Sequence, residues 1–200
     1  MFPLDRFTVV LDACTMFPML VRDVLLTLAD HGFFSPKWSP RINDEWKRNL
    51  LARMTERDGE VVAKTKVDRI ASAVTSAFPD ALVLAELPEP PILDPVDAKD
   101  RHVVLTAIAA RADAIVTFNI TDFAVDHLAE KLRIEVIHPD DFVMDLVDLN
   151  EKRALAAFRE LRARKKNPAW ERTELIRRLR DAGLVQTSLW LNAGDVVALI

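Results

Sequence analysis

The chain has 200 residues, which is enough for one domain of ordinary size and a small appendage. Half of the residues are hydrophobic, so the chain can bury a substantial core, and this excludes wholesale disorder. The net charge of −4 argues against a protein that coats nucleic acid with its whole surface.

Cys14 is the only cysteine, which excludes an internal disulfide and a cluster of thiolate metal ligands. The N-terminus has no basic segment followed by a long apolar run, so no signal peptide is expected. The longest uncharged runs, such as residues 182–194, are shorter than the roughly 18 apolar residues of a membrane-spanning helix. These features predict a soluble, cytoplasmic protein without a membrane partner.

The first third of the chain alternates between strand and helix patterns. Residues 7–11 form a β-branched run typical of a buried strand, which ends at Asp12. Residues 16–28 have apolar side chains at helical spacing, Gly32 closes this helix, and residues 33–35 follow as a short strand.

Ser39 and Pro40 predict the start of a second helix, because serine is a good N-cap and proline fits the first helical position. The same patterns predict further helices and strands along the chain, namely helices at 41–53, 64–78, 98–112 and 124–132, and strands at 82–84, 114–118 and 134–137. Residues 88–95 form a proline-rich loop. The alternation predicts a three-layer α/β/α fold with a mainly parallel sheet.

After about residue 148 only helices are predicted, at 151–165 and 168–182, and Gly183 ends the second. We therefore divide the chain into an α/β domain at 1–148 and a mostly helical extension at 149–200. Between Lys152 and Arg180 there are eleven Lys or Arg and three Glu, a local charge of +8, so the remaining chain carries −12. A basic arm beside an acidic body is compatible with a polyanion-binding surface, and equally with solvated helix faces.

Acidic residues fall where a parallel sheet binds ligands, beyond the carboxyl ends of its strands. Asp12 follows the first strand and Asp122 follows the strand at 114–118, while Glu45 and Asp100 lie near the starts of two helices. If these segments converge, they form an all-oxygen site that suits Mg²⁺ or Mn²⁺. Singly, each acid also fits a helix cap, a favourable first-turn charge or an exposed position. His102 is interpreted as a helix-surface or packed residue.

Four segments together resemble the PIN-domain ribonuclease family, and the resemblance covers about residues 7–143. They are Val-Val-Leu-Asp-Ala-Cys-Thr at 9–15, Ser-Pro-Arg-Ile-Asn-Asp-Glu at 39–45, Asp-Arg-His-Val-Val-Leu-Thr-Ala-Ile-Ala at 100–109, and Ala-Ile-Val-Thr-Phe-Asn-Ile-Thr-Asp-Phe at 114–123. The last two segments are the more specific ones.

The resemblance implies a metal-dependent endoribonuclease similar to the bacterial VapC-type toxins, with RNA as substrate, a cognate antitoxin as partner and a possible homodimer. Its catalytic acids would be Asp12, Glu45, Asp100 and Asp122, and its metal ligands Asp12, Asp100 and Asp122, with Glu45 as a further ligand or as the residue that orients water. The resemblance also implies products with 5′-phosphate and 3′-hydroxyl ends.

The neighbours of this site depart from the family pattern at two positions. Cys14 stands where Asn or Ser is usual, which puts a hydrogen bond behind the ligands in doubt, and Asn119 stands where many members have Asp. Thr117 is a further polar neighbour in the motif. Asp97 is an additional acid that could line the site.

Three other functions remain open at this point. A haloacid-dehalogenase-type phosphatase also begins with a strand-terminal Asp, but Cys14 occupies the position of its second Asp. A receiver domain would need paired Asp residues after the first strand. The third is a catalytically degenerate PIN fold that serves as an RNA-binding or regulatory module.

The basic arm carries a separate hypothesis about RNA. Arg164, Lys165 and Lys166 end the first C-terminal helix, and we predict that they bind the phosphates of RNA beside the acidic site. Trp170 is placed to pack or to stack on a base. The competing interpretation is a surface for the antitoxin or for a second subunit.

Overall fold

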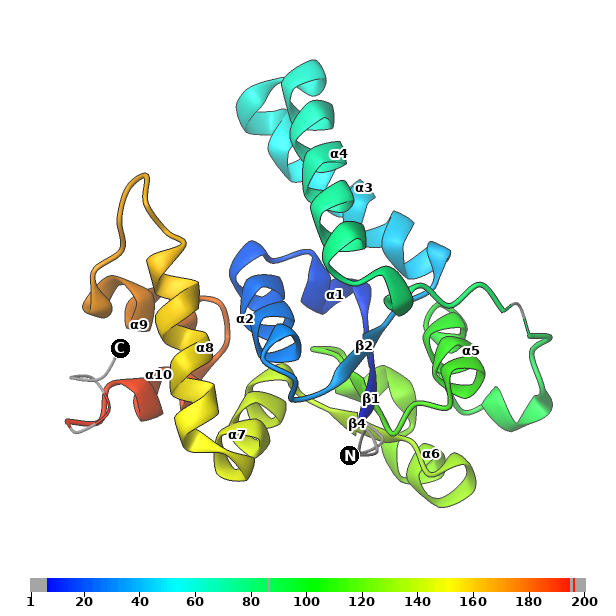
Figure 1. The fold of residues 1–200 in the computed structure, drawn as a ribbon. Helices are drawn as coiled ribbons and strands as arrows, with labels where there is room; N and C mark the ends of the chain where they lie inside the picture. Colours follow the sequence, from blue (N-terminus) through cyan, green and yellow to red (C-terminus); the bar gives the residue numbers. More distant parts are fainter. Residues whose placement is uncertain (1–6, 86, 195, 197–200) are drawn as a thin grey trace.

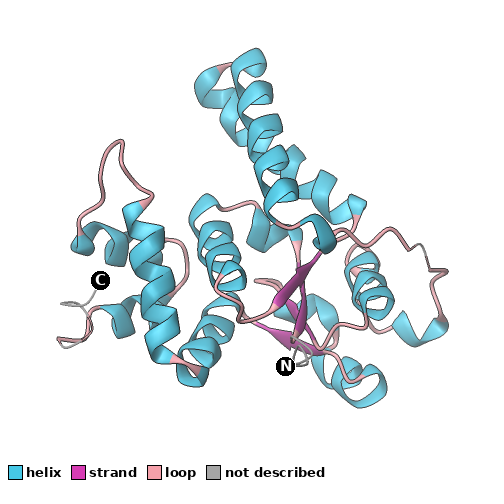
Figure 2. Cartoon of the chain, in the orientation of Figure 1, coloured by secondary structure: helices cyan, strands magenta, loops and turns pink. Residues whose placement is uncertain are grey.

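A four-stranded parallel sheet lies at the centre of the computed structural model, which describes residues 7–85, 87–194 and 196 (Figures 1 and 2). Its strands are β1 (Thr8–Leu11), β2 (Ser35–Lys37), β3 (Ala114–Val116) and β4 (Glu135–Ile137), in the order β2-β1-β3-β4. The central strands β1 and β3 pair in parallel with Leu11 beside Val116, so both end at the same level. Their carboxyl ends therefore share one edge of the sheet.

Helices cover both faces of the sheet, which confirms the predicted three-layer α/β/α fold. In Figure 1, α2 and α7 lie on one side of the strands and α5 on the other. The α-helices are α1 (Ala13–Met16), α2 (Met19–Asp30), α3 (Pro40–Asp58), α4 (Glu60–Ala77), α5 (Arg101–Ala110), α6 (Val125–Leu132), α7 (Pro139–Leu149), α8 (Glu151–Ala163), α9 (Arg172–Asp181) and α10 (Val185–Leu191). Short 3₁₀ helices are η1 (Pro79–Ala81), η2 (Pro91–Leu93) and η3 (Ile120–Phe123).

The core strands are buried because both faces are covered, as their β-branched sequences predict. Val9, Val10 and Leu11 of β1 are completely buried, and so are the three residues of β3. None of the helices in the described residues has the length and low charge that crossing a membrane requires.

Helices α3 and α4 form a hairpin that projects from the body (Figure 1). The Ser39 hydroxyl accepts a hydrogen bond from the Ile42 amide at 3.3 Å, with Pro40 at the first helical position, as predicted. Gly59 joins the two helices with φ of +78°, a conformation that costs glycine little. Within this hairpin, α3 packs against α1, the short helix that follows β1.

Several predicted boundaries are wrong. The helix predicted at 16–28 is split into α1 and α2, because Pro18 has no amide hydrogen to continue the helical bonding. The strand predicted at 33–35 lies two residues later, as β2. The strand predicted at 82–84 is reduced to a single parallel bridge between Leu82 and Trp38. Helices α7 and α10 were not predicted.

The C-terminal helices pack on the body through an apolar stripe, as their periodicity predicts. Leu155, Phe158 and Leu161 of α8 are buried, and α8 packs against α2. In α9 the buried residues are Leu175, Ile176 and Leu179. The extension is therefore docked and does not project into solvent.

Candidate functional site

Asp12 and Thr117 meet at the shared edge of the two central strands. The Asp12 amide continues the ladder by donating to the Val116 carbonyl at 3.1 Å, which aligns Asp12 with Thr117. The Thr117 hydroxyl donates to Asp12 Oδ2 at 2.7 Å, and both side chains are buried. The second oxygen of Asp12, Oδ1, accepts no hydrogen bond from a described residue, so it is the oxygen left for a ligand.

Cys14 supports the same carboxylate. Its thiol donates to Asp12 Oδ2 at 3.1 Å, and its sulfur accepts from the Phe118 amide at 3.3 Å. Burial, followed by the negative charge of Asp12, raises the pKa of the Cys14 thiol to about 12. The group therefore stays a neutral donor at physiological pH, and the hydrogen bond behind the acids is kept despite the departure at this position.

Asp100 lies at the start of α5 in a concentration of negative charge. Burial, and then the charges of Asp12, Asp122, Asp97 and Glu45, raise the pKa of its carboxyl to about 6. The carboxylate accepts no hydrogen bond from a described residue and does not cap its own helix. All the acids predicted from sequence are therefore electrostatic neighbours of Asp100, and its ionised form gains little stabilisation from the protein.

Asp122 is brought to this cluster by a short turn after β3. It lies in η3, where its amide donates to the Asn119 carbonyl at 3.1 Å. Its own carbonyl accepts from the Asp97 amide at 2.9 Å, which ties η3 to the loop before α5. The backbone amide of Asn119 donates to the Thr117 hydroxyl at 3.0 Å, and the residue is exposed to solvent.

Glu45 reaches the cluster from the projecting helix α3. Its Oε2 lies 3.1 Å from His102 Nε2, and its Oε1 accepts from Arg41 Nε at 3.3 Å. The preceding residue, Asp44, points away and pairs with Lys47 at 2.7 Å. His102 is buried and belongs to this arrangement, which the sequence analysis missed. The only signal for it was a histidine two positions after Asp100.

The donor set suits a hard divalent cation, because every acid offers oxygen and the thiol stays protonated. Within the residues that the structure describes, no three His, Cys, Asp or Glu side chains are arranged closely enough to hold an ion together. The acids nevertheless repel one another, as the raised pKa of Asp100 indicates. A cation bound among them would relieve this repulsion.

Two protein-family models match this chain. A family model described as a PIN domain matches residues 8–121 and so includes Asp12, Glu45 and Asp100. The chain belongs to the PIN-domain family. A second model, described as the VapC50 C-terminal domain, matches residues 139–192. The C-terminal helices are therefore similar to the VapC50 C-terminal domain.

One curated relative is similar to part of this PIN protein. It is named "Putative ribonuclease VapC50", from Mycobacterium tuberculosis (strain ATCC 25618 / H37Rv), and is 45% identical over 60 residues. The match covers 30% of this chain and 35% of that protein, so it spans about a third of the relative's length. No solved structure matches the chain.

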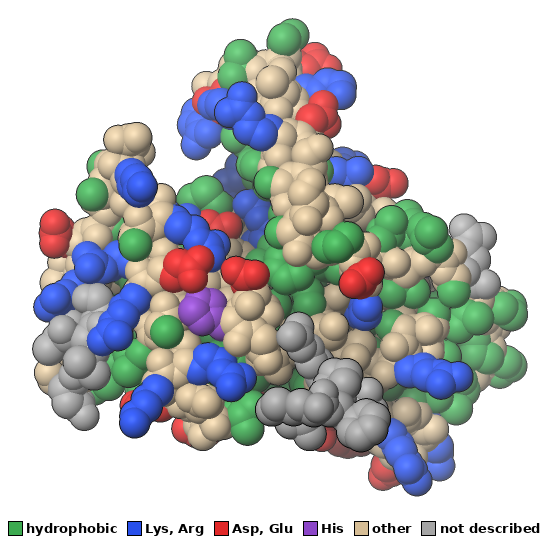
Figure 3. Space-filling model, viewed as in Figure 1, with side chains coloured by type: hydrophobic (Ala, Val, Ile, Leu, Met, Phe, Trp, Pro, Cys, Tyr) green, Lys and Arg blue, Asp and Glu red, His purple; other side chains and the backbone are tan. Residues whose placement is uncertain are grey.

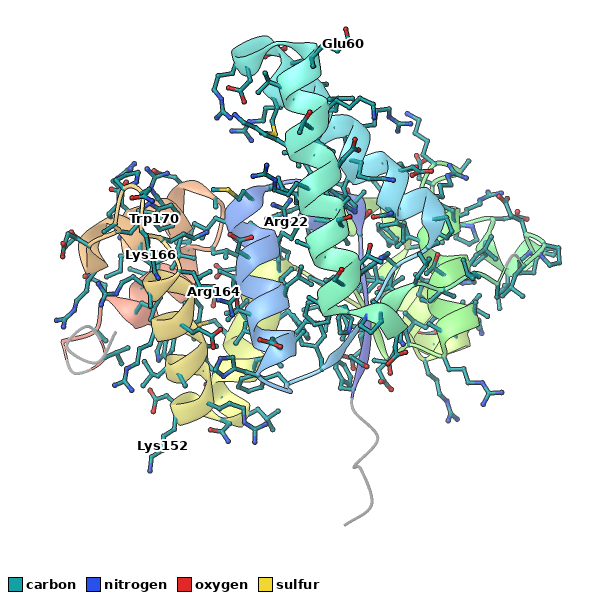
Figure 4. All side chains as sticks on the ribbon, turned by 45° about the horizontal axis from the view of Figure 1, so that its top comes forward. Arg22, Glu60, Lys152, Arg164, Lys166 and Trp170 are labelled. Carbon is teal, nitrogen blue, oxygen red and sulfur yellow. The ribbon has the colours of Figure 1, made fainter. Side chains whose placement is uncertain are left out.

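The basic C-terminal arm of this PIN protein is partly paired within the fold. Arg164 contacts Glu160 of its own helix and lies 3.8 Å from Asp30 of α2, and Lys165 pairs with Asp23 of α2. Figure 4 shows Arg164 on the side of α8 that faces α2. These pairs hold α8 on α2. Lys166 is exposed, and RNA binding by the three residues stays a prediction.

Trp170 packs inside the C-terminal part. Its side chain is buried and lies between two cations, with Lys165 Nζ 5.1 Å and Arg178 Cζ 4.6 Å from the ring centre. On the face shown in Figure 3, Lys and Arg side chains gather mainly over the C-terminal helices and the tip of the α3–α4 hairpin. Trp170 is therefore a packing residue in this fold, and it is not free to stack on a base.

Proposed function

We propose that this PIN protein is a Mg²⁺-dependent endoribonuclease that hydrolyses phosphodiester bonds of RNA. The single observation that carries the proposal is the position of Asp100, half-buried and unbonded among four other acids. Such a cluster is unfavourable by itself and becomes favourable around a cation. Mn²⁺ has the same preference for oxygen ligands and would also fit.

The residues take distinct roles in this proposal. Asp12, Asp100 and Asp122 would hold the ion directly or through bound water, and Glu45 would complete the site as a ligand or orient the attacking water. When bound, the ion supplies an activated hydroxide and charge neutralisation at the phosphoryl group. Thr117 and Cys14 hold Asp12 Oδ2, and Oδ1, which accepts no hydrogen bond from a described residue, would bind the ion.

The proposed chemistry does not require His102 as a general base. Its Nδ1 lies 2.8 Å from the Lys99 carbonyl oxygen, which can only accept, so Nδ1 carries a hydrogen. Its Nε2 faces the Glu45 carboxylate, which only accepts, so this contact is a hydrogen bond when Nε2 carries a hydrogen as well. Both ring nitrogens thus have partners within the protein, and the proposed chemistry relies on the acids.

We also propose that the protein is the toxin of a toxin–antitoxin pair. The VapC50-type C-terminal match and the name of the curated relative support this role. The proposal adds an antitoxin protein as partner, with a second copy of the chain as a further possible partner. RNA remains the proposed substrate.

Cleavage of RNA by the purified full chain tests the nuclease proposal. Activity should require Mg²⁺ or Mn²⁺ and disappear with EDTA, and Asp100→Asn should lower it by at least about 100-fold, because the charge that holds the ion is removed. Circular dichroism should show that the variant is folded.

Two adjacent carboxylates provide the matched control. Glu45→Gln should reduce cleavage strongly, whereas Asp44→Asn should leave it within about twofold, because Asp44 is exposed and pairs with Lys47 on its own helix. Full activity of Asp100→Asn contradicts the assignment. RNA binding without cleavage, under every metal condition, would favour the catalytically degenerate PIN module.

A further inference from the structure

His102 connects the helix that carries Glu45 to the helix that begins at Asp100. The ring belongs to α5 and is 9% exposed, and its Nε2 contacts Glu45 of α3 across 57 positions of sequence. Its Nδ1 is held by the Lys99 carbonyl in the turn before α5. The imidazole is therefore held by its Nδ1 at Lys99, and its Nε2 contacts Glu45.

The turn that anchors His102 is itself tied to the acid cluster. The Lys99 amide donates to Asp97 Oδ1 at 2.9 Å, and the Asp100 amide donates to the Asp97 carbonyl at 2.9 Å. The same few residues thus position Asp100 and the imidazole. Because Asp97 uses its side chain for this turn, its contribution to the site is chiefly its charge on Asp100.

Glu45 needs such a partner because the neighbouring acids repel it. Its long side chain starts from a helix surface and can turn away to solvent, as that of Asp44 does. Its other contact, Arg41, lies on the same helix and is more than half exposed, so it cannot draw Glu45 toward α5. His102 is the contact that comes from the opposite side of the site.

We propose that His102 is the positioning residue of this site, which holds Glu45 against the repulsion of the other acids and so sets the affinity for Mg²⁺. The inference rests on the proposed function for its catalytic consequence. Residues that orient metal ligands typically change metal affinity or activity by about 10–100-fold when replaced. We expect an effect of that size on Mg²⁺ binding and on kcat, with KM for RNA nearly unchanged.

Replacement of His102 by Gln or by Asn tests its two hydrogen bonds separately. In His102→Gln the amide can reach the position of Nε2 and donate to Glu45, while the bond to Lys99 is lost. In His102→Asn the amide can replace Nδ1, but it is too short to reach Glu45. His127→Asn is the matched control, because His127 is a half-buried histidine whose side chain has one hydrogen bond within the described residues, between its Nε2 and the Ile92 carbonyl at 2.8 Å.

The experiment measures Mg²⁺ affinity by calorimetry, and kcat and KM on RNA, for the folded full-length variants. His102→Asn should lose about 10–100-fold in affinity and kcat, His102→Gln should recover most of this loss, and His127→Asn should match the parent protein. In a Glu45→Gln background, His102→Asn should add little, because the contact is already changed.

The outcomes separate this inference from the nuclease proposal. If the parent protein binds Mg²⁺ but does not cleave RNA, the nuclease proposal fails, while the affinities of the three histidine variants still test His102. If the parent binds no Mg²⁺, the inference fails as well. Equal affinities of His102→Asn and the parent overturn the inference even in an active enzyme. The inference is also overturned if His102→Asn lowers the Mg²⁺ affinity equally in the parent and in the Glu45→Gln background. The effect of His102 would then not depend on Glu45.

Discussion

Replacement of Asp140 tests how the C-terminal helix α10 is held on α7. Asp140 is a buried residue of α7, and its carboxylate accepts three hydrogen bonds from the start of α10. They come from the Gln186 amide at 2.7 Å, the Thr187 amide at 3.0 Å and the Thr187 hydroxyl at 2.8 Å. Leu184, the residue at the N-cap position of α10, makes no side-chain cap. Asp140 therefore caps this helix from another element of the fold.

The magnitude follows from these three bonds. Each hydrogen bond to a charged group contributes about 1.5–3 kcal/mol, but water entering the space left by the carboxylate would satisfy part of the loss. We therefore expect Asp140→Ala to lower the free energy of unfolding by about 3 kcal/mol. For a chain of this size the corresponding fall in Tm is roughly 6–12 °C.

The neighbouring residue Asp141 is the control. It is exposed and accepts one side-chain hydrogen bond, from Gln186, among the described residues, so Asp141→Ala should change stability by less than about 0.5 kcal/mol. Urea denaturation and thermal melting, both followed by circular dichroism, measure the two variants. A combined Asp140→Ala and Thr187→Val variant should be less destabilised than the sum of the two single variants, because the residues share a bond.

Limited proteolysis locates the effect of the Asp140 replacement. If Asp140 holds α10 in place, the Asp140→Ala variant should be cut faster within residues 184–194 than the parent, with the PIN domain resistant. A stability of Asp140→Ala within about 0.5 kcal/mol of the parent would refute the capping argument. So would a loss of stability without any change in cleavage near α10.

Three further predictions concern Asp100, the toxin role and the basic C-terminal arm. In EDTA the contribution of Asp100 to the free energy of unfolding, measured as the difference between the parent and Asp100→Asn, should rise as the pH falls from about 7 toward 4, because the folded state raises the pKa of Asp100 to about 6 and so binds the proton more tightly than the unfolded chain. Asp100→Asn should therefore stabilise the metal-free protein at pH 7, by about 1 kcal/mol once solvent screening of this half-exposed group is allowed for, and urea titrations at several pH values check both effects. Expression of the parent in bacteria should arrest growth while Asp12→Asn does not, and harmless expression of a demonstrably active enzyme would contradict the toxin role. Neutralising Arg164, Lys165 and Lys166 together should weaken RNA binding and flatten its salt dependence, whereas unchanged RNA binding with lost antitoxin binding would assign the arm to protein contacts.

Local patterns in the sequence were sufficient for much of the fold. The β-branched runs predicted β1 and β3, and Ser39 with Pro40 predicted the start of α3, because these signals act through neighbouring residues. The segment at 82–84 has equally strong strand propensity but forms one bridge, since a strand also needs a partner of sufficient length.

The order of the acids along the chain identified the candidate site, because strand ends in a parallel sheet converge on one edge. The charges of Asp12, Glu45 and Asp122 do act on Asp100, as that reasoning requires. Their catalytic roles remain predictions. The departure at Cys14 put a hydrogen bond behind the ligands in doubt, but burial keeps its thiol protonated and able to donate to Asp12.

Only the tertiary structure decided which side chains meet across long separations. His102 contacts Glu45 across 57 residues, and Lys165 pairs with Asp23 across 142. Nothing in the local sequence around either residue distinguishes an inward contact from a solvated charge. Such pairs form where helices pack, and packing brings together side chains whose partners lie far away in the chain. A periodic pattern could place His102 on a helix, but the approach of α3 to α5 made it a residue of the acid cluster.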